Sequence, residues 1–143
     1  MQSPNVQRQG GWYSPWSRLE LRLLLPRAME LIGEPGSFVE LRLCGDREIV
    51  RLNQEYLGLP GPTNVLSFPC LEAADKQQGL LGQICISLPA VERESVLYAQ
   101  EPRQHMLRLL MHGILHLAGY PHGEQMQALT EQGVQELDMG RWT

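Results

Sequence analysis

The sequence contains few cysteines, and none of them form a CxxC pair. Cys44, Cys70 and Cys85 are odd in number and stand among apolar residues. This usage is not the framework of a disulfide-stapled domain, and it is typical of buried thiols in a reducing compartment. We therefore expect three free cysteines.

Lysine is almost absent, because Lys76 is the one lysine among 12 basic residues. With 16 acidic residues the formal net charge is -4, which argues against a uniformly basic nucleic-acid-binding protein but leaves room for a local basic groove. Arginine's planar guanidinium suits bidentate contacts to phosphate better than the lysine ammonium does. The composition is thus compatible with an RNA partner without indicating one.

Long apolar runs are missing as well. Residues 1–17 lack the apolar segment of a secretion signal, and every apolar run is far shorter than the ~20 residues of a membrane-spanning helix. The sequence predicts a cytoplasmic protein with no membrane partner.

The chain is long enough for one domain with one core, at 143 residues and 43% hydrophobic content. Residues 1–13 are polar and glycine-rich, and we expect a poorly ordered tail there. Apolar periodicity and turn residues predict helices at 16–33 (kinked or divided by Pro26), 46–56, 89–100, 102–118 and 123–140, strands at 37–44, 65–69 and 80–88, a turn at 57–64 and an exposed loop at 70–79. This order predicts a single α+β or α/β domain with a small mixed sheet flanked by helices.

Three of the four histidines lie in the stretch MHGILHLAGYPHGE, residues 111–124. His112 and His116 stand four residues apart, the spacing that places two imidazoles on one face of a helix. Gly119 and Pro121 are the residues that end a helix and turn the chain, so that His122 approaches the pair from outside. Three imidazoles with no fourth protein ligand are typical of a catalytic zinc site, in which one position stays open.

The helix that carries this motif is apolar on nearly every side except along one polar stripe. The stripe contains His105, Arg108, His112 and His116. A polar stripe on a buried helix favours a cavity, and we expect the metal site at the end of this helix, in a zincin-like arrangement.

Separate motifs resemble the signatures of the YbeY family: PTNVLSFP at residues 62–69, LGQICIS at 81–87 and HGILHLAGYPH at 112–122. The family pattern, roughly LN..YRG.D.PTDVLSFP, LGDI.IS and HGxLHLxGYDH, maps in this order from Leu52 to His122. The resemblance implies a metal-dependent endoribonuclease that acts in ribosomal RNA maturation and ribosome quality control. It also implies one zinc ion on His112, His116 and His122, and RNA, the ribosome or ribosomal proteins as partners. The oligomeric state is not indicated.

Four positions depart from the family pattern, and each loses a formal charge. Leu57 replaces the arginine of YRG, and Asn64, Gln83 and Pro121 each replace an aspartate. Metal binding and fold depend on imidazoles and packing, which these changes leave intact. Catalysis depends also on a positioned cation and on carboxylates that orient the ligands, so the changes weaken the prediction of nuclease activity.

Four residues are candidates for further catalytic roles. Arg108 lies one turn before His112 and is placed to supply the missing cation, the alternative being an arginine held in a salt bridge. Glu124 is the nearest carboxylate after the histidines and a candidate proton acceptor, although acids are also common in the first turn of a helix. By resemblance, Asn64 and Ser67 line the cleft, the alternative for Ser67 being a cap at the end of a strand.

Two other functions fit parts of the sequence. The spacing H-x3-H-x2-G-x2-H also occurs in metzincin peptidases, but their general base would stand at position 113, which is glycine here. The stronger alternative is a zinc-binding, ribosome-associated protein of the same fold with reduced or lost nuclease activity, and the four charge-removing changes support it.

Overall fold

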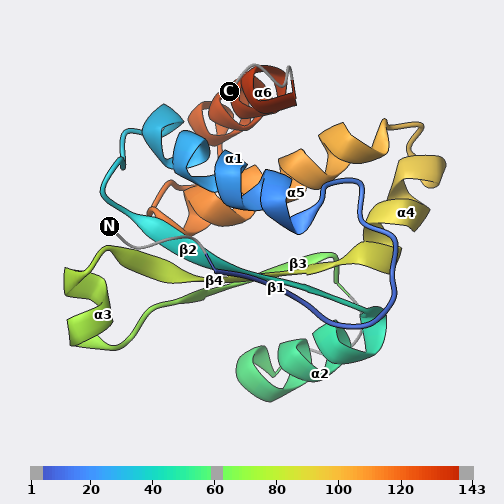
Figure 1. Ribbon diagram of the computed structural model, residues 1–143, viewed down its shortest axis with the longest axis horizontal. Coiled ribbons are helices and arrows are strands. Elements are labelled where there is room, and N and C mark those ends of the chain that lie inside the picture. Colours follow the sequence, from blue (N-terminus) through green and yellow to red (C-terminus); the bar gives the residue numbers. More distant parts are fainter. Residues whose placement is uncertain (1–4, 59–62, 139–143) are drawn as a thin grey trace.

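A mixed four-stranded sheet forms the centre of the computed structural model, which describes residues 5–58 and 63–138 (Figure 1). The strands are ordered β1-β2-β4-β3; β2 pairs in parallel with both β1 and β4, and β3 pairs antiparallel with β4. Their bounds are β1 Asn5–Arg8, β2 Phe38–Cys44, β3 Val65–Pro69 and β4 Leu80–Ser87. The predicted small mixed sheet of an α+β domain is confirmed.

The helices cover the two faces of the sheet unequally. Helices α1, α5 and α6 lie on one side, and α2 lies on the other (Figure 1). The bounds are α1 Arg18–Leu31, α2 Asp46–Leu57, α3 Ala73–Gln77, α4 Leu88–Leu97, α5 Pro102–Leu117 and α6 Glu124–Asp138. Within the described residues, no helix is long and apolar enough to cross a membrane.

The core has two parts that follow the alternation of the strands. On the α1, α5 and α6 side, Leu41, Leu43, Ile84 and Ile86 belong to the larger hydrophobic cluster. On the α2 side, Cys44 and Cys85 pack with Ile49, Leu52 and Leu66. The three cysteines are free as expected, and burial raises the pKa of Cys44 to about 12 and that of Cys85 to about 11, while Cys70 is only half-buried.

The prediction of a poorly ordered tail over residues 1–13 was wrong for residues 5–8; residues 1–4 lie outside the described part of the chain. Residues Asn5–Arg8 form edge strand β1, which pairs with Glu40–Leu43 of β2. Val6 is buried in the larger cluster, and its carbonyl accepts a hydrogen bond from Arg18 Nε. One apolar residue in NVQR is too weak a pattern to reveal a strand whose stability comes from pairing.

Several predicted elements change in detail. Helix α1 runs through Pro26 as one helix, and a short helix, α3, lies in the exposed segment predicted as a loop. Residues 59–62 of the predicted turn lie outside the described chain. Gly133 of α6 is buried, and a Cβ there would stand 2.8 Å from Met111 Cε, so its missing side chain allows α6 to approach α5.

Candidate functional site

Helix α5 is fixed at both ends by local sequence. Pro102 occupies the first turn, and the carboxylate of Glu101 accepts a hydrogen bond from the Gln104 amide at 3.0 Å. At the other end the Tyr120 amide donates to Leu115 O at 3.0 Å, and Gly119 has a φ of 90°. That left-handed conformation favours glycine, which explains how the chain turns after the helix as predicted.

The turn brings the three histidines of residues 111–124 together. The ring centroids of His112 and His122 are 5.2 Å apart, and those of His116 and His122 are 5.8 Å apart. All three side chains line one cavity of ≈ 670 Å³. Burial, followed by the charges of His122 and His116, lowers the pKa of His112, and this favours the neutral ring that a metal requires.

The donor set and the ring spacing fit a zinc ion. With Zn–N bonds of about 2.0–2.1 Å, two imidazoles on one tetrahedral ion have centroids roughly 5 Å apart. In the part of the chain that the structure describes, however, no group of three or more His, Cys, Asp or Glu side chains is arranged to hold a metal. The three rings are therefore neighbours at a spacing suitable for zinc, but their present arrangement does not form a metal site.

The rest of the cavity wall comes from four elements. Leu57 ends α2, Asn64 immediately precedes β3, Ser67 lies in β3, and Thr130 lies on α6. Helix α5 contributes His105 and Arg108 beside the two ligand candidates, so the predicted polar stripe does face a cavity.

Arg108 already has partners within the protein. Its Nε donates to Glu131 Oε1 at 2.8 Å, and its remaining nitrogens donate to Glu131 Oε2 at 3.4 Å and to Gln100 Oε1 at 2.6 Å. Arg108 thus forms the salt bridge of the second interpretation, and its catalytic role stays a prediction. A phosphate would have to compete with Glu131 for this side chain.

Sequence reasoning placed His105 on the polar stripe but missed the carboxylate that binds it. Glu94 of α4 lies 2.8 Å from His105 Nε2, and Asn64 Nδ2 donates to its two oxygens at 3.1 and 3.2 Å. Helix α4, helix α5 and the segment just before β3 thus meet at this carboxylate. No motif of the sequence pointed to Glu94, because only the packing of α4 on α5 brings it near the cavity.

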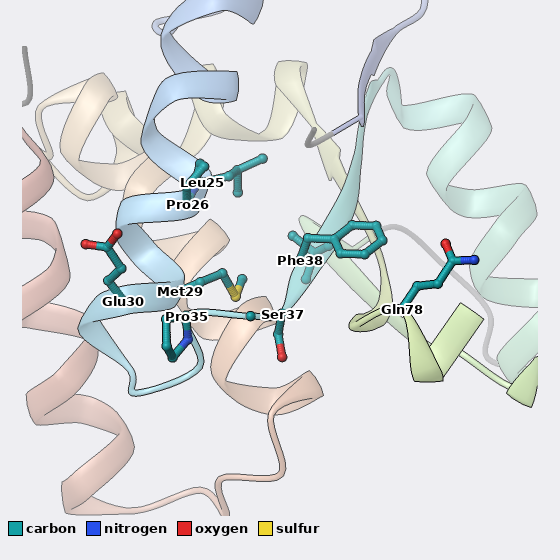
Figure 2. A pocket seen from close by; sticks show the side chains of 10 residues that line it. Leu25, Pro26, Met29, Glu30, Pro35, Ser37, Phe38 and Gln78 are labelled. Atoms are coloured by element: carbon teal, nitrogen blue, oxygen red, sulfur yellow. The ribbon is translucent and has the colours of Figure 1, made fainter. Parts of the chain in front are cut away.

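A second large cavity differs in chemistry from the histidine cavity. It measures ≈ 610 Å³ and lies between α1 and the start of β2, as Figure 2 shows. Its lining includes Leu25, Met29 and Phe38, and among the described residues that line it Glu30 is the one charged side chain and no histidine is present. The cavity lined by the histidines is therefore the candidate for catalysis.

The family model described as Endoribonuclease YbeY matches residues 20–139. The chain belongs to the YbeY family. A relative named Endoribonuclease YbeY from Oleidesulfovibrio alaskensis is 43% identical over 136 residues, covering 82% of this chain and 80% of the relative. One of the same name from Nitratidesulfovibrio vulgaris is 40% identical over 115 residues, covering 69% and 71%. The solution structure of a Thermotoga maritima protein matches with a TM-score of 0.66 and 27% identity, covering 96% of this chain and 90% of that one.

The four departures from the YbeY pattern do not all lie at the site. Leu57 and Asn64 line the cavity, whereas Gln83 and Pro121 do not. Gln83 pairs with Phe68 and alternates with Ile84, so it lies on the sheet face that α2 covers. The loss of charge that bears on the cavity is thus confined to two positions.

Gly113 faces the sheet, away from the histidines that flank it. A Cβ at this position would stand 3.1 Å from Ser67 Oγ and 3.2 Å from Ile84 Cγ2, and Ser67 Oγ donates to Gly113 O at 3.4 Å. A glutamate here would therefore point into the helix–sheet contact. This geometry removes the place of the metzincin general base, in agreement with YbeY membership.

Glu124 lies in the exposed first turn of α6 and is not among the residues that line the cavity. Negative charge is favourable at that place in any helix. Its role as a proton acceptor stays a prediction, as do the catalytic roles of Asn64 and Ser67.

Proposed function

We propose that this chain is a cytoplasmic endoribonuclease that holds one zinc ion on His112, His116 and His122. Its substrate is ribosomal RNA, which it cleaves at phosphodiester bonds during ribosomal RNA maturation and ribosome quality control, with the ribosome or ribosomal proteins as partners. The observation that carries the proposal is the gathering of three imidazoles at one cavity, in a chain of the YbeY family.

The residues of the cavity suit an anionic substrate. Bound zinc supplies a positive centre that activates water or polarises a phosphate oxygen. Three neutral imidazoles leave that positive charge uncompensated, which favours binding of the phosphate backbone. Asn64 and Ser67 line the same cavity and offer hydrogen bonds to a ribose or phosphate oxygen. Apolar Leu57 and Leu109 also border the site.

The test combines metal analysis with RNA cleavage. The purified protein is expected to contain about one zinc per chain and to cut a structured ribosomal RNA fragment, and His112→Ala, prepared identically, is expected to lose both properties. Lys76→Ala, an exposed change on α3, serves as the matched purification control. Equal cleavage by wild type and His112→Ala would identify a contaminating nuclease, and failure to bind zinc would exclude the metal centre.

A second function is favoured by the state of Arg108. It is the one arginine or lysine among the described residues that line the cavity, and Glu131 and Gln100 occupy its guanidinium. A protein of this fold that binds zinc and ribosomal RNA without cleaving it would need no free cation. Zinc content and RNA binding with no cleavage above the His112→Ala background would support this alternative.

A further inference from the structure

Glu94 is the meeting point of three elements beside the histidine cavity. Its carboxylate accepts hydrogen bonds from Asn64 Nδ2, at 3.1 and 3.2 Å, and contacts His105 Nε2 at 2.8 Å. The His105 and Glu94 side chains are 11% and 21% exposed, so the contacts are largely shielded from solvent. Charge-assisted contacts of this length in a shielded place fix the geometry of all three side chains.

The partners of Glu94 face the cavity, and Glu94 stands behind them. Asn64 and His105 line the cavity together with His112, whereas Glu94 is not among the lining residues. An ionised carboxylate only accepts hydrogen bonds, so the Asn64 amide nitrogen and the His105 Nε2 hydrogen must point toward Glu94. Asn64 Oδ1 and His105 Nδ1 are then the polar atoms that Glu94 leaves unengaged. The Asn64 oxygen is a hydrogen-bond acceptor, and so is Nδ1 of a neutral His105 ring.

We propose that Glu94 is a positioning residue of this site, which holds Asn64 and His105 as paired acceptors for a hydroxyl group or water in the cavity. The proposal rests on the proposed function for its substrate. Its role matches that of carboxylates that orient working histidines in other active sites.

The same contacts give a reason for asparagine at position 64. An aspartate there, at 3.1 and 3.2 Å from the Glu94 oxygens, would oppose two carboxylates. Two such groups cannot both be ionised without a large cost. Asparagine at 64 and glutamate at 94 therefore form a pair, and exchanging the amide and the carboxylate keeps the pair's total charge.

The exchange is the decisive experiment on activity. Glu94→Gln and Asn64→Asp are each expected to lower kcat/KM for the ribosomal RNA fragment by about 10- to 100-fold, with zinc content unchanged. The double variant Asn64→Asp/Glu94→Gln restores one amide and one carboxylate, so it is expected to be more active than either single variant. Glu92→Gln, the same chemical change at an exposed position of α4, is the matched control and is expected to behave as wild type.

A structural readout is independent of cleavage. The His105 ring hydrogen bonded to Glu94 is expected to exchange slowly with water and to give a downfield NMR signal, which Glu94→Ala removes while the fold persists. The thermal unfolding midpoint is measured for wild type, the two single variants and the double variant. The double variant is expected to lose less stability than the sum of the two single losses, as for activity.

The outcomes separate the two proposals. If wild type cleaves no RNA, the proposed function fails, and the NMR signal and the unfolding cycle still decide whether Glu94 orders the site. Independent, additive losses in the double variant would overturn the pairing of Asn64 with Glu94. Full activity of Glu94→Gln, or a wild-type protein without the protected His105 hydrogen, would overturn the positioning role.

Discussion

Gly113 shows how one absent side chain sets the distance between α5 and the sheet. Replacing it with alanine adds helix propensity worth about 1 kcal/mol, but the new Cβ would lie 3.1 Å from Ser67 Oγ and 3.2 Å from Ile84 Cγ2. Over-packing of a core typically costs about 1 to 3 kcal/mol, which is the larger effect. We expect Gly113→Ala to lower the free energy of unfolding in urea by about 1 kcal/mol net. Gly36→Ala, where a Cβ meets open space, should change it little, and a more stable Gly113→Ala protein would contradict the packing argument.

Asp46 gives the molecule a pH-dependent contact between α2 and α4. Arg93 donates to its carboxylate at 2.6 and 3.2 Å and Ser87 Oγ donates at 2.9 Å, and these bonds lower the pKa of Asp46 below its ordinary value of 3.8. A carboxyl with a depressed folded-state pKa stabilises the protein fully above its unfolded value, and this stability is lost as the pH falls through the folded pKa. Urea unfolding between pH 7 and pH 2 should therefore show a smaller acid-induced loss for Asp46→Asn than for wild type. Parallel pH profiles for the two proteins would show that the contact contributes nothing.

At the scale of elements, the α5–α6 pair controls Arg108, the arginine that lines the histidine cavity. Glu131 of α6 binds Arg108 of α5 through two contacts, at 2.8 and 3.4 Å. Replacing Glu131 by glutamine removes the competing charge, so Arg108 becomes available to a phosphate. We expect Glu131→Gln to bind the ribosomal RNA fragment several-fold more tightly, with a steeper dependence on salt because one more phosphate is neutralised.

The matched control for this change is Glu136→Gln, which alters the same charge on the same helix. Glu136 is exposed and lines a different cavity, together with Arg27 and Glu30. It should therefore leave RNA affinity near the wild-type value. An equal gain in RNA affinity in both variants would mean that only net charge matters. No gain in either variant would show that Arg108 does not contribute to RNA binding.

At the scale of the whole molecule, metal binding should stabilise the fold, because the unfolded chain cannot present three converging imidazoles. Zinc at about 100 times its dissociation constant adds about 2.7 kcal/mol, which corresponds to a rise of roughly 5 to 10 °C in the unfolding midpoint for a chain of this size. Calorimetry of the chelator-treated protein with and without added zinc measures this shift. His122→Ala should lose the shift while keeping the midpoint of the metal-free protein, and an equal shift in both proteins would point to zinc bound elsewhere.

The elements with strong local patterns could be predicted from sequence. Alternation over Phe38–Cys44 and the apolar run Leu80–Ser87 predicted both central strands. Pro102 and Gly119 predicted the two ends of α5. The histidine spacing and the turn at Gly119 brought His112, His116 and His122 together as expected. These features depend on interactions between residues close in the chain, which a single sequence displays directly.

Features that depend on contacts between distant residues were decided only by the tertiary structure. Pairing with β2 makes a strand of Asn5–Arg8, although its sequence has one buried apolar residue. The packing of α6 on α5 pairs Arg108 with Glu131, and the packing of α4 on α5 brings Glu94 into contact with Asn64 and His105. The sequence by itself determined the imidazoles and the family motifs, because each is encoded in a short segment. The charges around them come from the neighbouring helices α4 and α6, so only the folded protein could show which side chains they meet.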